Sequence, residues 1–267
     1  MHGCASSGVL MAAFPENYLP MVEVKNVTMR FNNVEAVKDI SLNVTRGDVL
    51  GLVGSDGAGK STLLRLIATM IKPVQGEIYI NGLNVIADKQ KIKNIIGYMP
   101  QRFGLYQDLT VEENMDFFMD IFDVPRKERK KRKEKYLGFS NLLPFTDRLA
   151  GNLSGGMKQK LGLACVLVHE PLLLILDEPT NGVDPVSRHE FWEILGSMQK
   201  EGMTIIVSTA YLDEGERCDR VGLMHSSILL DMESPDVIRG SFKTLEEAII
   251  ERIKEVDGEL ANDTFHF

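Results

Sequence analysis

A glycine-rich run that ends in a lysine and a hydroxyl residue is the strongest chemical signal in the chain. Residues 54–62 are GSDGAGKST and match G-x-x-x-x-G-K-[ST] at every fixed position. Glycines let the backbone curl so that successive N–H groups point at phosphate oxygens. Lys60 adds a charge for the outer phosphates, and Ser61 a hydroxyl for Mg²⁺. The run predicts a nucleoside triphosphate site formed by Gly54, Ser55, Asp56, Gly57, Ala58, Gly59, Lys60, Ser61 and Thr62.

Two neighbouring carboxylates follow an apolar run. Residues 172–176 are LLLIL, and Asp177 and Glu178 come next. Such a run indicates a buried strand of a parallel sheet, and ligands bind at the carboxyl ends of such strands. Asp177 can act as a ligand for magnesium beside Ser61, and Glu178 can polarise the water that attacks the γ-phosphate. An acidic strand end without a role is the alternative, and the phosphate-binding run argues against it.

A serine and two glycines form a second anion-binding pattern, in LSGGMKQ at 153–159. The serine can cap a helix and hydrogen-bond a phosphate, and the glycines let the helix start approach an anion. A second helix end of this kind is redundant for one nucleotide in one chain. It is explained if two such domains pair head to tail and each closes the nucleotide site of the other. The residues predicted to meet the partner's nucleotide are Ser154, Gly155, Gly156 and Met157.

The elements that must position these residues follow from the sequence pattern. A strand over 48–53 and a helix from Lys60 to about Ile71 flank the glycine-rich run. Alternating residues at 22–31 and 34–44, joined by Asn32-Asn33, predict an antiparallel pair. The pattern predicts an α/β fold with a mainly parallel sheet that holds the run. Further predictions are strands at 78–80, 95–99, 172–176 and 204–208, and helices at 110–122, 126–135, 154–169, 186–200, 212–218 and from Thr244 onward.

Over Val22–Gly240 the sequence resembles the ATP-binding cassette (ABC) ATPases, on the GSDGAGKST, LSGGM and LLLILDEP strings. The resemblance implies a P-loop NTPase core with an antiparallel β subdomain and an ABC-type helical subdomain. It implies ATP and Mg²⁺ as ligands, with Glu178 and Gln101 as catalytic residues and Ser61, Gln101 and Asp177 at the metal. It also implies that Phe31 stacks on adenine and that Asp184 belongs to the D-loop.

Three longer strings resemble the ATPases that work with ABC-2-type permeases, closest to the first cassette of tandem-cassette multidrug exporters. They are GYMPQRFGLYQDLT, RLAGNLSGGMKQKLGLAC and GVDPVSRHEFW. This resemblance implies a second ABC ATPase domain, in a homo- or heterodimer, and an ABC-2-type membrane permease as partners, with residues 103–106 at the permease contact. The implied location is cytoplasmic, peripheral on the inner face of the cell membrane. A split gene, a truncated chain and a standalone subunit are all compatible with it.

Two positions depart from the family pattern. Ala210, in STAYLDE, stands where the family has its switch histidine, and alanine offers no side-chain hydrogen bond to the γ-phosphate. Losing one such donor typically lowers a rate by ~10²–10³. Asp56 stands where asparagine is common, and its charge disfavours the phosphates unless it points toward a partner domain. Neither His169 nor His225 is placed to substitute for the missing histidine.

Composition limits the other classes of function. Lys plus Arg total 30 against 38 for Asp plus Glu, a net charge of -8, which argues against nucleic acid as a partner. Three dispersed cysteines suggest neither zinc nor disulfides, and no apolar run approaches the ~18–20 residues of a membrane span. We predict a disordered extension over 1–20, an ABC domain over 21–240 with its helical subdomain at about 110–151, and a helical tail over 241–267.

The basic run RKERKKRKEK at 126–135 is open to three interpretations: a solvated helix face, a patch for anionic lipid or an acidic partner, or a nucleic-acid contact.

The sequence as a whole is compatible with three hypotheses about function. The leading hypothesis is an exporter ATPase. The second is a nucleotide-binding partner subunit that hydrolyses poorly, which Ala210 favours and Glu178 and Gln101 oppose. The third is a soluble ATPase of translation or of DNA repair. Translation types carry a second cassette and repair types a long coiled-coil insertion, and this sequence shows neither.

Overall fold

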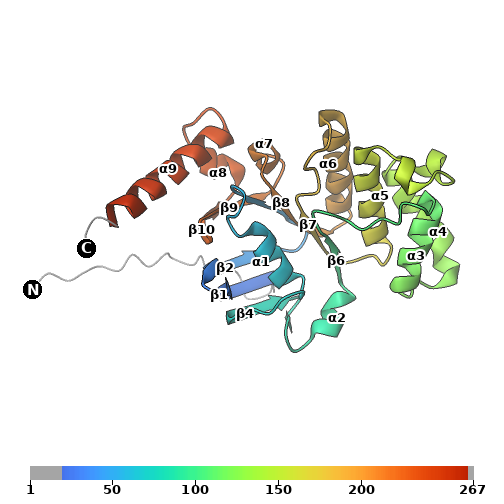
Figure 1. Cartoon of the computed structure of the whole chain (residues 1–267), viewed down its shortest axis with the longest axis horizontal. Helices are drawn as coiled ribbons and strands as arrows, with labels where there is room; N and C mark the ends of the chain where they lie inside the picture. Colours follow the sequence, from blue (N-terminus) through green and yellow to red (C-terminus); the bar gives the residue numbers. More distant parts are fainter. Residues whose placement is uncertain (1–19, 264–267) are drawn as a thin grey trace, which may run out of the picture.

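Five parallel strands and one antiparallel strand form the sheet that carries the glycine-rich run. The computed structural model describes residues 20–263, and its larger sheet has the order β10-β9-β3-β8-β7-β6 (Figure 1). Only β10 runs antiparallel to its neighbour. The strands are β3 (Val49–Val53), β6 (Ile96–Met99), β7 (Leu173–Asp177), β8 (Thr204–Thr209), β9 (Arg220–His225) and β10 (Ile228–Glu233).

A smaller antiparallel sheet covers one side of the larger one. Its order is β2-β1-β4-β5, and the predicted antiparallel pair runs from Val22↔Val44 to Phe31↔Val34, with register shifts between Val24 and Arg30. The strands are β1 (Val22–Phe31), β2 (Val34–Val44), β4 (Gln75–Ile80) and β5 (Leu83–Asn84). The α/β prediction, with a mainly parallel sheet and an antiparallel β layer, is confirmed.

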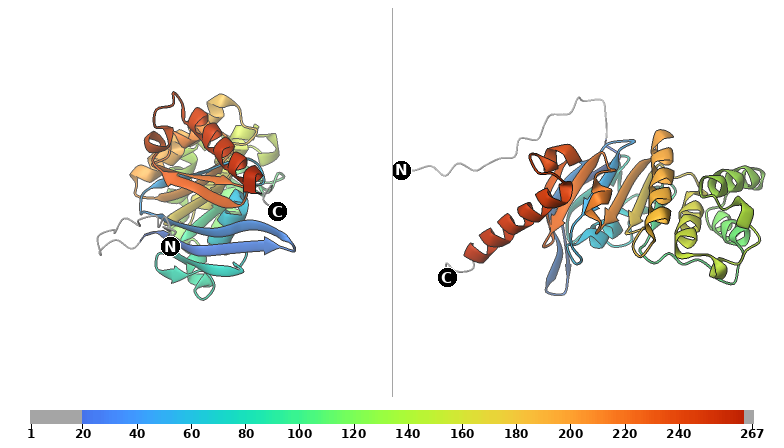
Figure 2. Two further views of the ribbon diagram at one scale, coloured as in Figure 1. Left: turned by 90° about the vertical axis from the view of Figure 1, so that its left-hand side faces the viewer. Right: turned by 90° about the horizontal axis from the view of Figure 1, so that it is seen from above.

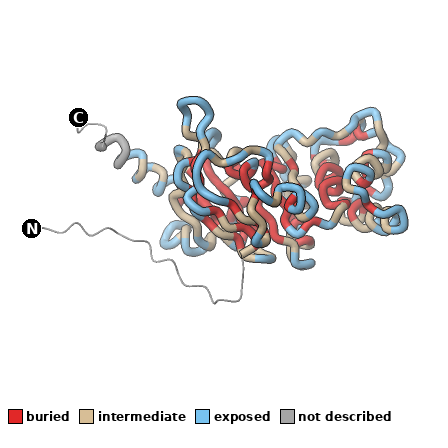
Figure 3. The backbone as a smooth tube through the Cα atoms, turned by 90° about the horizontal axis from the view of Figure 1, so that it is seen from below, coloured by how far each residue is buried: buried red, intermediate tan, exposed pale blue. Residues whose placement is uncertain are grey.

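The apolar strands are explained by cover on both faces of the larger sheet. Residues alternate along β3, so that Leu50 and Leu52 pack in one apolar core while Val49 and Val53 pack in the other. The first core holds α1 and the antiparallel layer, and the second holds the helices on the opposite face. Every residue of β7 is buried, as expected for a strand covered on both sides (Figure 3).

The seven predicted helices are present in the predicted order, but several of their ends differ, and two short helices at 89–93 and 235–239 were not predicted. Helix α1 stops at Ile67, four residues before the predicted end at Ile71. The reason is local: Thr69 has a left-handed backbone with φ 60°, which no α-helix accommodates. The helices are α1 (Lys60–Ile67), α2 (Lys89–Lys93), α3 (Val111–Ile121), α4 (Arg126–Phe139), α5 (Gly155–Leu167), α6 (Pro185–Lys200), α7 (Leu212–Gly215), α8 (Pro235–Arg239) and α9 (Leu245–Asp263), with 3₁₀ turns at Leu143–Phe145 and Ala150–Asn152.

Helices α3, α4 and α5 gather at one end of the molecule, beyond the edge strand β6 (Figure 2). Thr110 caps α3 through a reciprocal capping box with Glu113. These helices occupy the stretch where the helical subdomain is expected, although the division into domains stays a prediction. Several basic side chains of α4 form ion pairs within the chain, for example Lys133 with Glu112 and Asp116. These pairs favour the solvated-face interpretation of the run.

Helix α9 is anchored by its first turns at the end of the molecule opposite α4 (Figures 1 and 2). Leu245 and Ile249 are buried in the domain core, and Ile253 packs partly against it. The first turns of this helix therefore pack on the domain itself. The predicted extension over residues 1–20 lies outside the described residues, apart from Pro20. Among the residues described, no helix is both long and apolar enough to cross a membrane.

Candidate functional site

The glycine-rich run forms the turn between β3 and α1. Gly59 has φ 101°, and a Cβ at this residue would lie 2.2 Å from the carbonyl oxygen of Ala36, so only glycine fits. Lys60 is 3% exposed, and its Nζ donates to the carbonyl oxygens of Gly54 at 2.7 Å and Ser55 at 3.0 Å. The ammonium is thus held over the loop at the positive end of α1, where both charges attract an anion.

The remaining loop residues divide into an exposed tip and a covered base. Ser55, Asp56 and Gly57 are exposed, Ala58 is buried, and Ser61 and Thr62 are half-buried. Phe31 is 47% exposed at the end of β1. The contact of Gly59 with Ala36 brings the start of β2, next to this aromatic ring, against the loop. An exposed ring beside a phosphate-binding loop is available for the predicted stacking on a base.

Asp177, the last residue of β7, meets Ser61 as the sequence predicts. Its Oδ1 accepts hydrogen bonds from Ser61 Oγ at 2.7 Å and from Ser208 Oγ at 2.9 Å. Its Oδ2 is buried and has no hydrogen-bond partner among the described residues. A buried carboxylate oxygen without a partner suits a cation, and Mg²⁺ binds through one or two carboxylates with water and phosphate oxygens. The residues at this point therefore fit Mg²⁺.

The described residues contain no cluster of three or more His, Cys, Asp or Glu that could hold a metal alone. This agrees with an ion that is completed by phosphate oxygens. The Asp177 charge also acts on a neighbouring strand: burial first, and then this carboxylate, raises the pKa of Tyr98 on β6.

Glu178 is surrounded by polar groups from three other segments. Its Oε2 accepts hydrogen bonds from Gln101 Nε2 at 2.7 Å and from Asn181 Nδ2 at 3.1 Å. Its Oε1 lies 3.6 Å from Lys60 Nζ in a buried ion pair. The backbone of Glu178 is left-handed, with φ 48°, which is strained for a residue with a side chain. The backbone N–H donates to the carbonyl oxygen of Ser208 at 3.1 Å and to its Oγ at 3.0 Å, which stabilises this turn.

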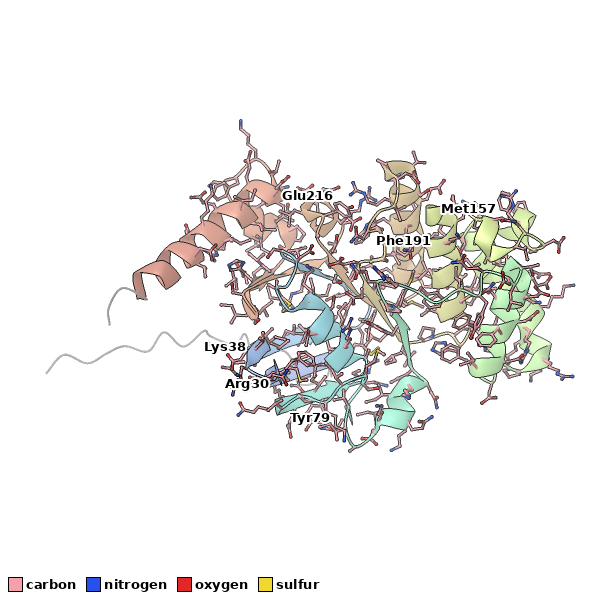
Figure 4. All side chains as sticks on the ribbon, in the orientation of Figure 1. Arg30, Lys38, Tyr79, Met157, Phe191 and Glu216 are labelled. Carbon is pink, nitrogen blue, oxygen red and sulfur yellow. The ribbon has the colours of Figure 1, made fainter. Side chains whose placement is uncertain are left out.

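The predicted signature residues start helix α5. Ser154 Oγ accepts a hydrogen bond from the N–H of Met157 at 3.3 Å, so the serine caps the helix as predicted. Ser154 and Gly155 are exposed. Gly156 is buried, and a Cβ there would lie 2.4 Å from Ser187 Cβ, so α5 approaches α6 closely. Figure 4 shows Met157 at the end of the molecule where α3, α4 and α5 gather.

Asp184 caps α6 beside this helix start. Its Oδ1 accepts a hydrogen bond from the N–H of Ser187 at 3.0 Å, and the hydrogen bonds from Ser187 lower the pKa of the carboxyl. The predicted D-loop residue and the predicted signature residues therefore lie on adjacent helix ends, because Ser187 also contacts Gly156. Neither Ser154 nor Asp184 is bonded to the glycine-rich loop of its own chain in the contacts that the described residues make.

Ala210 directly follows β8, the strand between the phosphate-binding strand and the carboxylate strand. Thr209 pairs with Val53 in the sheet, so Ala210 lies just beyond the sheet edge at which the glycine-rich loop begins. It is exposed. The histidines are engaged elsewhere: His169 Nε2 lies 2.9 Å from the carbonyl oxygen of Ile96, and His225 Nε2 lies 2.7 Å from Asp257 Oδ1. Neither takes the place of the missing switch histidine.

Three polar residues of the site were not predicted from the sequence. The Ser208 hydroxyl donates to the Asp177 carboxylate and accepts from the backbone N–H of Glu178. Asn181 bonds the Glu178 carboxylate, and Glu214 bonds Thr180 and Thr209 nearby. Ser208 could have been found from the fold class, since the carboxyl ends of adjacent parallel strands meet at one edge. The side-chain pairings of Asn181 and Glu214 depend on turns that no short motif specifies.

Comparison with known proteins agrees with this geometry. The ABC transporter family pattern matches residues 37–181. The probable multidrug ABC transporter ATP-binding protein YbhF of Escherichia coli is 46% identical over 220 residues, which cover 82% of this chain and 38% of YbhF. The ABC transporter ATP-binding protein NatA of Bacillus subtilis is 32% identical over 85% of this chain and 92% of NatA.

A solved dimeric ATP-binding cassette in a post-hydrolysis state, bound to ADP and Pi, superposes with a TM-score of 0.72 at 28% identity. The match covers 80% of this chain and 98% of that cassette. The fold, the family pattern and the relatives agree on one assignment. The chain belongs to the ABC transporter family, and its relatives YbhF and NatA are named as ABC transporter ATP-binding proteins.

Proposed function

We propose that this chain is the ATP-binding and ATP-hydrolysing subunit of an ABC exporter, in which closure of a cassette dimer and ATP hydrolysis drive a membrane permease. The observation that carries the proposal is the position of Glu178. Its carboxylate lies one residue past Asp177, which bonds Ser61, and contacts both Lys60 and Gln101. A base in this place adjoins the outer phosphates of a nucleotide bound at the loop.

The chain's own residues divide the chemistry among them. The loop N–H groups and Lys60 bind the phosphates, and the release of Lys60 from Glu178 toward the phosphates frees the carboxylate to accept a proton from the attacking water. Gln101 and Asn181 hold that carboxylate in place. Ser61 and Asp177, with Gln101, would hold Mg²⁺, which when bound neutralises charge on the phosphate oxygens. Phe31 would stack on the adenine.

The other half of the composite site comes from a second cassette. Ser154 and Gly155 are exposed on a helix start with free N–H groups, and Asp184 lies beside them. We propose that this surface closes on the nucleotide of a partner cassette, in a homo- or heterodimer. The dimeric arrangement of the solved relative supports this pairing.

The names of the relatives support a proposal for the permease partner and the location. YbhF and NatA are named as ABC transporter ATP-binding proteins, and YbhF as a probable multidrug one. We propose an ABC-2-type permease, contacted near Gln101 and residues 103–106, and a peripheral position on the cytoplasmic face of the cell membrane. The proposed domain limits are 21–240 for the cassette, with about 110–151 as its helical subdomain, and 241–267 for the tail.

A second function is favoured by one observation, the alanine at position 210. Without a side-chain donor there, the chain would bind ATP, hydrolyse it poorly and lend Ser154 to a more active partner. The intact contacts of Glu178 with Gln101 and Lys60 favour the first function. The two functions differ in turnover and agree on ATP binding.

Steady-state ATPase activity of the wild type, Glu178→Gln and Ala210→His separates them, with ATP binding measured in each. We expect slow turnover in the wild type. Glu178→Gln keeps the shape and removes the base, so kcat should fall by ~10²–10⁴ while ATP still binds. Ala210→His should raise kcat by about tenfold, less than the ~10²–10³ that a preorganised donor supplies.

Each outcome points to one reading. A nearly inactive wild type with a marked gain in Ala210→His identifies the weak half of an asymmetric pair. Brisk turnover that Glu178→Gln abolishes shows that Ala210 is no handicap, and the asymmetric reading is then wrong. Turnover that survives Glu178→Gln unchanged contradicts the assignment of Glu178 as the base.

A further inference from the structure

A buried carboxylate that the proposed chemistry does not use lies behind the hydrolytic site. Glu214, on α7, is 1% exposed. Its Oε1 accepts a hydrogen bond from Thr180 Oγ1 at 2.8 Å, and its Oε2 accepts one from Thr209 Oγ1 at 2.6 Å. A carboxylate is removed from water only where hydrogen bonds and a nearby cation compensate for the lost hydration. The contacts of Glu214 meet this condition.

The two threonines belong to the two segments that matter most for hydrolysis. Thr180 comes two residues after Glu178, within the turn whose Asn181 bonds the catalytic carboxylate. Thr209 is the last residue of β8 and directly precedes Ala210. The Thr209 hydroxyl also accepts a hydrogen bond from the N–H of Tyr211 at 2.9 Å, so one hydroxyl holds the backbone on both sides of Ala210.

Arg188 extends the same network to α6. Its Nε lies 3.8 Å from Glu214 Oε1, and its Nη2 lies 3.1 Å from Asp213 Oδ2. Its guanidinium carbon lies 4.7 Å from the ring centroid of Tyr211. Arg188 follows the helix cap Asp184 by one turn. The network therefore joins the turn after β7, the segment after β8 and the start of α6.

We propose that Glu214 is a positioning residue for ATP hydrolysis, which fixes the Ala210 segment against the turn that carries Glu178 and against the first turns of α6. The proposal rests on the proposed function. With alanine at position 210, no side chain of that residue can tie the segment to a bound nucleotide. The contacts of Glu214 with Thr180, Thr209 and Arg188 are then what holds the segment in register with the base.

Two threonines at opposite ends of β8 provide a matched test. Thr209 and Thr204 are 1% and 0% exposed, and each hydroxyl accepts a backbone N–H at 2.9 Å, from Tyr211 and Gly47 respectively. Thr209→Val and Thr204→Val each remove one such buried hydroxyl, so both should lower the melting temperature, and Thr209→Val more so because it also takes a hydrogen bond from the buried Glu214 carboxylate. Only Thr209→Val breaks the link to Glu214.

We expect Thr209→Val to lower kcat by about tenfold, which is the change that loss of one charge-assisted hydrogen bond typically produces. The Kd for ATP should stay within about twofold of the wild type, because the loop is untouched. Thr204→Val should keep the wild-type kcat per folded molecule. Amide hydrogen exchange over residues 209–213 should accelerate in Thr209→Val and not in Thr204→Val.

Glu214→Gln gives a second reading because it keeps the shape and removes the charge. It should lower kcat by about three- to tenfold and accelerate the same amide exchange. The double variant Thr209→Val/Glu214→Gln should be no slower than the slower single variant, because both changes act on the same hydrogen bond, the one between Thr209 and Glu214. If Glu214→Gln does not fold, the comparison of the two threonine variants still decides.

The outcomes separate this inference from the function on which it rests. If both Thr209→Val and Thr204→Val keep the wild-type kcat, the Glu214 network is only structural and the inference is wrong, while the proposed function stands. If the wild type does not hydrolyse ATP, or Glu178→Gln hydrolyses it as fast as the wild type, the proposed function fails and the inference fails with it.

Discussion

The phosphate-binding loop and the start of α5 are both predicted to bind phosphate, yet they are built in different ways. At the loop, Lys60 and Glu178 are buried and pair with each other, and they also bond the loop carbonyl of Gly54 and the neighbouring strand at Ser208, respectively. At α5, Ser154 and Gly155 are exposed, and Ser154 bonds only the N–H of its own helix among the contacts of the described residues. The charged groups of the loop are held by contacts within the chain, whereas the predicted phosphate-binding groups at the start of α5 are exposed on its surface.

The contrast has a physical reason. Charged side chains such as Lys60 and Glu178 can be buried only with partners in place, so the loop half has to be preorganised by its own fold. A helix start carries a partial positive charge and free N–H groups without any buried charge. It can therefore remain at the surface until a second molecule brings a phosphate. Variants of the two halves should then affect different steps, binding in one case and turnover in the dimer in the other.

Lys60→Met should have the largest effect. The change removes the charge that faces the phosphates and leaves Glu178 buried without its cation. Truncating one partner of such a charged contact typically lowers affinity by about 2–5 kcal/mol, so the Kd for ATP should rise about 100-fold or more. Titration calorimetry with ATP and excess Mg²⁺ measures this change.

Lys160→Met is the matched control for Lys60→Met. Lys160 is also buried, at 6% exposed, and its Nζ pairs with Glu190 Oε2 at 2.6 Å on α6. Both variants replace a buried lysine with a side chain of similar length. The control should lose stability and keep the wild-type Kd for ATP. Equal losses of ATP affinity in the two variants would mean that folding, and not phosphate contact, explains the effect of Lys60.

Ser154→Ala should leave ATP binding to the monomer unchanged and lower turnover by about tenfold, because the serine meets the nucleotide of the partner only in the closed dimer. Ser234→Ala is its control, since Ser234 caps α8 in the same manner, through the N–H of Val237 at 3.4 Å. Either variant removes a helix cap, typically ~1 kcal/mol of stability. The measurement is the ATPase rate as a function of protein concentration. Equal losses of turnover in Ser154→Ala and Ser234→Ala would contradict a role of Ser154 at the partner's nucleotide.

The sequence predicts the loop half better than its surroundings. The motif G-x-x-x-x-G-K-[ST] and the apolar run before Asp177 specify local structure, so the positions of Lys60, Ser61 and Asp177 could be predicted, and the contact of Ser61 with Asp177 is present. The contacts of Asn181 and Glu214 could not. Asn181 meets Glu178 inside an irregular turn, and Glu214 meets Thr180, 34 residues away, through side chains that no spacing rule governs. Helix ends such as Ile67 also escaped prediction, since Thr69 adopts its left-handed backbone in the folded chain.

Asp56→Asn should have the smallest effect, at the exposed tip of the loop half. The carboxylate is exposed, so water and salt screen its repulsion of the phosphates. We expect ATP to bind about two- to threefold more tightly at low salt, with the difference vanishing above ~0.5 M salt as the Debye length shrinks. Asp147→Asn removes the same charge from an exposed position near helices α3, α4 and α5. It should change the Kd for ATP neither at low salt nor at high salt. An unchanged Kd at low salt would instead show that Asp56 points away from the phosphates, toward the surface where a second cassette is expected. Its effect should then be measured in the dependence of the ATPase rate on protein concentration.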